Sequence, residues 1–211
     1  MLTKKQIEAL FVTFHHLNPD PKGELESVND YTFLVAVALS AQATDIGVNK
    51  ATRLLFAKYC TPQQMLDLGI DGLTDYVKSI GLYKTKAKNV IAAAKMLVEL
   101  HDGIVPNDQV ALEALPGVGR KTANVVRNIV FGEPTLAVDT HIFRVANRMG
   151  ICKATTPDKM MDKLPKKIPS DFLKDAHHWL ILHGRYTCKA RKPDCSNCPV
   201  YNLCQYKEKT A

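Results

Sequence analysis

The chain of 211 residues lacks the long apolar segments that a membrane protein needs. No stretch approaches the roughly 20 uninterrupted apolar residues of a membrane-spanning helix. The first residues, Met1 to Gln6, are followed by amphipathic periodicity and not by the apolar block of a secretion signal. We therefore expect a protein without a membrane partner that works in the cytoplasm, associated with the nucleoid if its source is bacterial.

Alternating strand patterns bounded by turns are almost absent, and no internal repeat or low-complexity linker occurs. Apolar residues instead recur at helical spacing nearly everywhere, and the hydrophobic fraction of 46% is ample for a packed core. The sequence predicts an all-α fold. Capping residues and Gly or Pro stops place its helices at about 3–17, 30–39, 45–58, 62–68, 72–79, 84–101, 108–114, 120–131, 140–149, 157–167 and 171–182. A break at Gly132-Glu-Pro134 separates two helical groups.

Acidic residues are too few to balance the basic ones. Lys and Arg outnumber Asp and Glu by 28 to 21, which gives a net charge of +7 and an isoelectric point near 9.1. Such a surface favours polyanionic partners, although the charge alone identifies none.

The sequence also gives no sign of a disulfide framework, because its six cysteines stand in a chain without a secretion signal. Cys60 and Cys152 lie singly inside helical patterns and are most simply interpreted as small buried apolar residues. The other four crowd near the end with the spacing C-x6-C-x2-C-x5-C: Cys188, Cys195, Cys198 and Cys204. Four soft thiolate ligands suit zinc or an iron–sulfur cluster equally well on spacing alone.

Two glycines one residue apart lie between two predicted helices, in the turn Pro-Gly-Val-Gly at residues 116–119. Glycine permits positive φ angles and a close approach of the backbone to a neighbour. Because Arg120 and Lys121 follow at a helix start, the turn can present backbone N–H groups to a phosphate oxygen. Without its surroundings, an ordinary helix–helix turn is the better interpretation.

The longer segment Leu-Pro-Gly-Val-Gly-Arg-Lys-Thr-Ala, residues 115–123, resembles the helix-hairpin-helix motif of DNA glycosylases. Its Lys-Thr-Ala ending is similar to the endonuclease III family. Further segments agree with that family in the same order: 39–45 (Leu-Ser-Ala-Gln-Ala-Thr-Asp), 80–83 (Ile-Gly-Leu-Tyr), 137–145, 178–188 and the terminal cysteines. The agreement spans about residues 30 to 206.

The resemblance implies two helical domains with a DNA cleft between them. A six-helix module at 22–132 would carry the helix-hairpin-helix at about 108–131, and residues 1–21 and 133–211 would form a discontinuous iron–sulfur cluster domain. It also implies that the four terminal cysteines bind a [4Fe-4S] cluster. The implied partner is double-stranded DNA with damaged bases or abasic sites, bound by a monomer.

The resemblance further implies a bifunctional DNA glycosylase and abasic-site lyase of base excision repair. Lys121 would attack C1′ of a flipped-out oxidised pyrimidine nucleotide and form an imine, and β-elimination would then cut the strand on the 3′ side. A free lysine has a pKa of about 10.4 and is a poor nucleophile while protonated, so an enzyme that uses one must stabilise the neutral amine. We expect the positive helix end and Arg120 to disfavour the ammonium form. Asp139 aligns with the family's catalytic aspartate, although capping the next helix explains it locally as well.

Other residues are expected to hold the duplex. Gln42 matches the family residue that enters the gap left by a flipped base, and Leu82 could wedge at the opposite strand or be a core leucine. Lys84, Lys86 and Lys88 form a basic run that suits phosphate contact or a solvated face. The remaining candidate DNA-binding residues are Gly117, Val118, Gly119, Arg120, His141, Arg191 and Lys192.

Two other function classes remain open from the residues alone. A non-catalytic helix-hairpin-helix module would need only the hairpin and the basic residues. An iron–sulfur electron carrier would need only the cysteines and would leave the hairpin unexplained. Among enzymes, adenine-mismatch glycosylases share the aspartate and the cysteines, but they lack a lysine at the position of Lys121 and carry a further domain.

Overall fold

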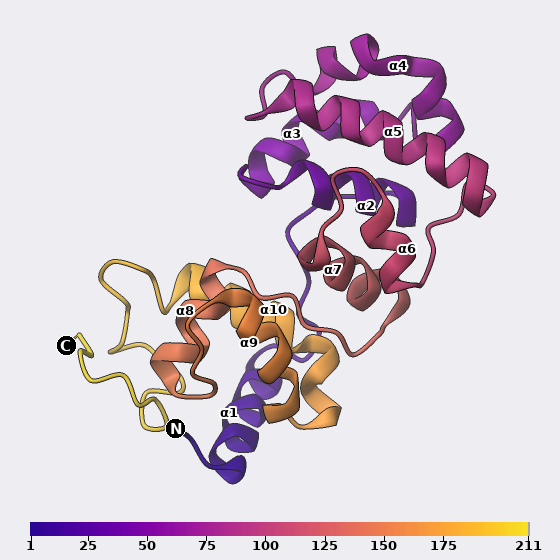
Figure 1. Ribbon diagram of the computed structural model, residues 1–211. Helices are drawn as coiled ribbons and strands as arrows, with labels where there is room; N and C mark the ends of the chain where they lie inside the picture. Colours follow the sequence, from indigo (N-terminus) through magenta and orange to yellow (C-terminus); the bar gives the residue numbers. More distant parts are fainter. Residues whose placement is uncertain (211) are drawn as a thin grey trace. The chain divides into compact units, whose positions relative to one another are not determined.

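A computed structural model describes residues 1–210, and within that range the chain is helical with no β-strand, which confirms the predicted all-α fold. Figure 1 shows the succession of elements. The helices are α1 (Lys4–Leu17), α2 (Asp30–Leu39), α3 (Asp45–Phe56), α4 (Pro62–Val77), α5 (Tyr83–His101), α6 (Gln109–Ala114), α7 (Arg120–Phe131), α8 (Thr140–Met149), α9 (Pro157–Lys163), the 3-10 helix η1 (Pro165–Lys167) and α10 (Ser170–Tyr186).

Local capping chemistry explains where many helices begin and end. Thr3 and Gln6 form a reciprocal capping box at the start of α1, and Thr61 caps α4 with Pro62 in its first turn. At the other ends, Gly132 and Gly150 adopt left-handed angles after α7 and α8. These capping interactions form between residues close in sequence, so they do not require tertiary packing.

Several predicted boundaries need correction. Element α4 contains the two helices that were expected, since Gly69 between them has non-helical angles (φ 72°, ψ 176°), but the second helix ends at Val77 and not at residue 79. The helix expected at 157–167 divides into α9 and η1 at Pro165. Helix α10 continues four residues past the expected Leu182, because neither Gly184 nor a proline stops it.

The chain divides into two compact units. One unit is continuous and runs from Glu24 to Gly132, and the other combines Met1–Gly23 with the chain from Glu133 onward. In the continuous unit α4 packs along α5, while α2 contacts α3, α5 and α7. Helix α2 is buried on nearly all sides, from Tyr31 to Leu39, so it is the central element of this unit.

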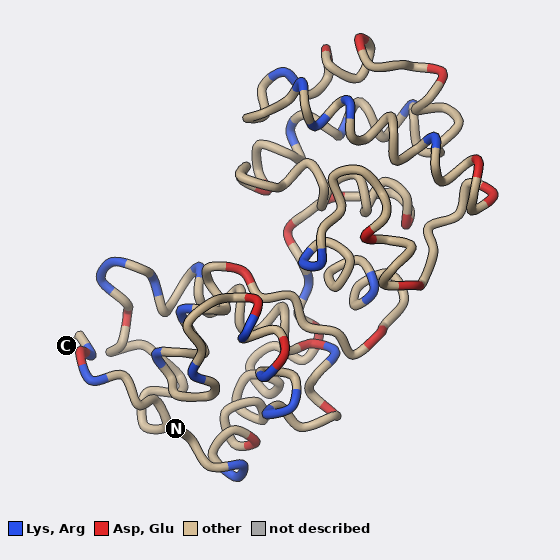
Figure 2. Tube along the Cα trace, in the orientation of Figure 1, with Lys and Arg blue, Asp and Glu red and all other residues tan. Residues whose placement is uncertain are grey.

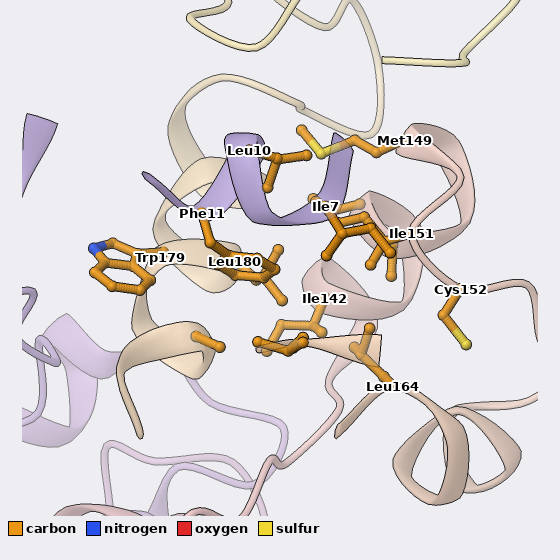
Figure 3. Close-up of a cluster of buried hydrophobic side chains, with 14 of the residues drawn as sticks. Ile7, Leu10, Phe11, Ile142, Met149, Ile151, Cys152, Leu164, Trp179 and Leu180 are labelled. Atoms are coloured by element: carbon orange, nitrogen blue, oxygen red, sulfur yellow. The ribbon is translucent and has the colours of Figure 1, made fainter. Parts of the chain in front are cut away.

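In the discontinuous unit, helix α1 supplies part of a core whose remaining side chains come from beyond residue 133. Ile7, Leu10 and Phe11 are buried against Ile142 and Leu180 (Figure 3). The Trp179 indole N–H donates to the backbone oxygen of Asn18 at 2.8 Å, just beyond the end of α1. The two ends of the chain are therefore joined in one core.

Within residues 1–210 no helix has both the length and the apolar character to cross a membrane.

The shared core predicts a strong asymmetry between two leucines of α1. Leu10 is fully buried, whereas Leu17 is 60% exposed. Replacing Leu10 by Ala removes buried methyl groups and is expected to cost about 2–5 kcal/mol, while Leu17→Ala should stay within about 0.5 kcal/mol. Native-state hydrogen exchange checks this, since L10A should lower the protection of amides in α8 and α10. Equal protection in L10A and L17A would contradict a core shared between the chain ends.

Candidate DNA-binding and catalytic site

The turn between α6 and α7 is anchored by buried side chains and leaves two backbone amides without a protein acceptor among the described residues. Leu115 and Val118 are buried, and the Val118 amide donates to the Leu115 oxygen at 3.0 Å. Gly117 has φ 82°, and a Cβ there would lie 3.0 Å from Asn89 Cβ. Within residues 1–210 the amides of Gly117 and Gly119 donate to no protein group, so both can meet an anionic oxygen. Val118 pins the turn and has neither its side chain nor its amide free for DNA.

Helix α7 begins with unusual chemistry for a helix N-terminus. Gly119 is its N-cap and provides no side-chain cap, and the first turn contains no acidic residue. Arg120 and Lys121 stand there instead, and both are exposed. Figure 2 shows the basic and acidic positions along the whole trace. The positive end of the helix dipole and two cations thus share one place, an arrangement that favours a bound anion. The amine of Lys121 is accessible to a substrate.

Gln42 and Leu82 are exposed residues in the left-handed region of backbone space, with φ 54° and 60°. Leu82 is 60% exposed, so its interpretation as a core leucine is wrong. The loops that carry them adjoin, since a Cβ on Gly81 would lie 3.8 Å from the Gln42 oxygen. Such backbone angles are costly for residues other than glycine and cluster at functional sites. The fold therefore presents two exposed side chains on strained backbone positions of neighbouring loops.

The basic run at the start of α5 is not one surface. Lys84 and Lys88 are exposed, but Lys86 is only 7% exposed and its Nζ has no hydrogen-bond partner within the described residues. Burial lowers the pKa of Lys86, because desolvation disfavours its charged form. Both expectations for this residue, phosphate contact and solvation, are therefore wrong. Its spacing of two from each neighbour turns it toward the interior of the helical unit.

Asp139 is fixed by the buried chain on either side of it. Leu136, Ala137 and Val138 are buried, and the Ala137 oxygen lies 3.1 Å from Nδ1 of the buried His177. Asp139 itself is half-buried, and its Oδ1 accepts the Ile142 amide at 2.7 Å as the N-cap of α8. The capping role expected from sequence is confirmed. Lys121 and Asp139 belong to different units, so their meeting is part of the proposal below.

The four C-terminal thiols lie within electrostatic range of one another. The pKa of Cys198 is raised to about 11, mainly by burial and also by the like charges of Cys204, Cys188 and Cys195. Three of the sulfurs meet nitrogen atoms: Cys188 Sγ at 3.8 Å from Arg148 Nη1, Cys198 Sγ at 3.8 Å from His183 Nε2, and Cys204 Sγ at 3.5 Å from the Tyr206 amide. Nitrogen donors around crowded thiols fit an anionic thiolate cofactor.

The thiols do not by themselves identify the metal. Within residues 1–210 no three His, Cys, Asp or Glu side chains are placed as around a single ion. The loop that follows Cys188 carries Arg191 and Lys192, both exposed, and Lys192 has φ 49°. Its backbone is strained in the same way as that of Gln42 and Leu82. Of the other two cysteines, Cys152 is buried as expected, whereas Cys60 is half-buried and not part of the core.

Sequence reasoning missed the groups around the thiols. Arg144 Nε donates to the Cys188 oxygen at 3.0 Å, and its Nη2 donates to Gly184 at 2.7 Å and lies 3.3 Å from His141 Nδ1. His141 is thus half-buried and engaged within its own unit. The sequence does show two arginines four residues apart on α8, Arg144 and Arg148. Their role becomes clear only once the position of the cysteine loop is known.

Comparison with known proteins now connects these features. The family model described as HhH-GPD superfamily base excision DNA repair protein matches residues 35–170, and the iron–sulfur binding domain of endonuclease III matches residues 188–204. Endonuclease III of Rickettsia conorii is 58% identical, covering 95% of each chain, and that of Escherichia coli is 56% identical, covering 91% of each. The chain belongs to the endonuclease III family.

Solved structures agree with this membership. A trapped covalent intermediate of endonuclease III with DNA superposes with a TM-score of 0.90 at 44% identity, covering 97% of each chain. A thermostable thymine-DNA glycosylase superposes with a TM-score of 0.86 at 25% identity, covering 98% of each. This endonuclease III family member is accordingly a DNA-binding, bifunctional DNA glycosylase and abasic-site lyase, and its cofactor is a [4Fe-4S] cluster. A binding module without catalysis and a simple electron carrier are thereby excluded.

The hairpin geometry predicts different outcomes at its two glycines. Gly117→Ala places a Cβ at a left-handed φ and against Asn89, so we expect a loss of about 1–3 kcal/mol of stability. Gly119→Ala meets nothing within 4 Å at φ −100°, so it should cost less than about 1 kcal/mol as a poorer N-cap. Thermal unfolding of both variants measures the difference. Equal melting temperatures would show that the turn is not constrained at Gly117.

Proposed function

We propose that Lys121 is the nucleophile of the glycosylase and lyase reactions. Its supporting observation is an exposed amine in the first turn of α7, directly after a turn with two amides available to a phosphate. The neutral amine attacks C1′ of the damaged nucleotide and the C1′–base bond breaks, so the base leaves with its electron pair and takes up a proton; the C1′–O4′ bond then opens, O4′ gains a proton, and the imine remains. The imine acidifies the C2′ proton, and its removal expels the 3′ phosphate by β-elimination. The trapped covalent intermediate solved for a relative is consistent with this course.

Asp139 is the second catalytic group of the proposal. Its carboxylate accepts the amide hydrogen bond of Ile142, which holds it at the start of α8. An anion held there can stabilise the positive charge that develops at C1′ as the base leaves. This role requires the units of residues 24–132 and of residues 1–23 and 133–210 to be the six-helix and cluster domains that flank a DNA cleft.

The proposed grip on the duplex has two parts. Phosphates are held by the amides of Gly117 and Gly119 and by positive side chains. Gln42 fills the gap of the flipped base, and Leu82 wedges at the opposite strand. The positive side chains are Lys84, Arg120, Arg191 and Lys192, with His141 as a further candidate beside Asp139. Val118 contributes by fixing the turn. Strained backbones at Gln42 and Leu82 hold the inserting side chains in place before DNA arrives.

The cluster ligands in this proposal are the four C-terminal cysteines: Cys188, Cys195, Cys198 and Cys204. All four lie within residues 188–204, the range that the iron–sulfur binding domain of endonuclease III matches. When bound, the cluster ties together both ends of the loop with Arg191 and Lys192, so it organises a phosphate contact and stabilises its unit. The bond chemistry is left to Lys121.

The proposed substrates are oxidised pyrimidines in double-stranded DNA and abasic sites, processed by a monomer. The proposed place of action is the cytoplasm, at the nucleoid if the source is bacterial. A panel of duplexes tests the substrate class: thymine glycol, an abasic site, a thymine opposite guanine and undamaged DNA. Faster release of mismatched thymine than of thymine glycol would replace the proposed substrate by that of the thymine-DNA glycosylase.

Reduction of the imine provides the test of Lys121. Borohydride should trap a covalent complex of the wild-type protein with a thymine glycol duplex, and Lys121→Ala should reduce trapping below detection because the attacking amine is gone. Lys58→Ala removes another exposed lysine of the same unit and should trap normally. A trapped complex that persists in K121A at wild-type yield would sink the mechanism.

Two substitutions separate the capping and catalytic roles of Asp139. Asn is as good an N-cap as Asp, so Asp139→Asn should change stability by less than about 0.5 kcal/mol, whereas Asp139→Ala should cost about 1 kcal/mol. Both should slow base release roughly 100-fold or more, because the stabilising charge is lost. Single-turnover base release and thermal unfolding are measured on the same samples. Full activity in D139N would leave Asp139 as a cap alone.

A further inference from the structure

Arg148 joins helix α8 to the beginning of the cysteine loop. Its Nη1 donates to the Lys189 oxygen at 2.7 Å and lies 3.8 Å from Cys188 Sγ, and its Nη2 donates to the Ala190 oxygen at 3.0 Å. One guanidinium thus fixes three consecutive residues of the loop. Because arginine presents its donors in a rigid fork, this geometry is specific to that side chain.

The other face of the same guanidinium is covered from the chain end. The Arg148 Cζ lies 4.7 Å from the centroid of the Tyr206 ring, two residues after Cys204. Arg148 is consequently half-buried, held between the segments that follow the first and the last of the proposed ligands. A cation above an aromatic ring is attracted to it, and the contact limits the freedom of the side chain.

No carboxylate within the described residues pairs with Arg148 or with its neighbour Arg144. Arg144 lies one helical turn earlier and donates to the Cys188 oxygen, so two cations converge on the same end of the loop. Like charges side by side repel each other, so a nearby anion stabilises both cations. Four thiolates around an iron–sulfur core supply it, since their charge exceeds that of the core.

We propose that Arg148 is a positioning residue of the cluster: it counters the negative charge at Cys188, donates to that sulfur and clamps residues 188–190 onto α8. This inference rests on the proposed set of four cysteine ligands. Positive charge and N–H donors at a ligating sulfur favour the reduced cluster, so Arg148 raises its reduction potential. The clamp also slows iron loss, because Arg148 holds residues 188–190 against α8.

Two variants separate charge from geometry. Arg148→Met keeps the aliphatic stem but removes the charge and all donors, whereas Arg148→Lys keeps the charge without the forked donors. Arg53→Met is the matched control, since Arg53 is an exposed arginine of α3 in the other unit. The measurements are film voltammetry of the purified holoproteins and the loss of visible cluster absorption after addition of an iron chelator.

We expect R148M to shift the cluster to a more negative potential and to release iron roughly tenfold faster than the wild type. R148K should lie between the two for potential and release iron faster than the wild type, and R53M should match the wild type. Wild-type potential and iron release in R148M would overturn the proposal. If R148M takes up no cluster, R148K decides, and its identity with the wild type in both measurements overturns the proposal equally.

A different result addresses the ligand set on which the proposal rests. Normal iron binding by the C188S variant would contradict that set and remove the proposal with it. Altered iron binding in C188S, together with wild-type behaviour of R148M and R148K, would contradict the role of Arg148 alone.

Discussion

The burial of α1 in the core of the C-terminal helices is the constraint on which the rest of the structure depends. Leu10 and Phe11 are inaccessible to solvent and belong to one buried cluster with Ile142 and Leu180. Since the two ends of the chain meet in that core, residues 24–132 form an insertion whose first and last residues both connect to one folded body. The same core buries one face of α8, and thereby fixes the positions of Asp139 at its start and Arg148 near its end.

Helix ends could be predicted where the signal is local. The capping box of Thr3 needs only its neighbour three residues on, and a glycine at 150 ends α8 through its own backbone angle. The assignment of α1 to the C-terminal unit was not readable in this way, because it depends on side chains more than 120 residues away. Only the family resemblance suggested it. The burial of Lys86 was missed for the same reason, since a run of lysines gives no sign of which one faces inward.

The candidate site shows the same division between local and distant information. The turn at Gly117 announces itself by its glycines, and its φ of 82° explains why glycine stands there. Asp139 looks like any N-cap, and its geometry is that of an N-cap. The catalytic interpretation of Asp139 comes from the family resemblance of the residues around it in the sequence, and not from its contacts in the structure. Arg148 carries no motif at all, because its partners are backbone oxygens of a loop that follows 40 residues later.

The left-handed backbones of Gln42 and Leu82 also carry an evolutionary consequence. A glycine at either position would relax the local conformation and make the folded chain more stable, since glycine adopts positive φ without steric cost. It would also delete the side chains that we propose to fill the space left in a base stack. Selection for stability alone would therefore favour glycine at both positions. The presence of Gln42 and Leu82 instead implies that the chain forgoes some folding stability to keep these two side chains exposed.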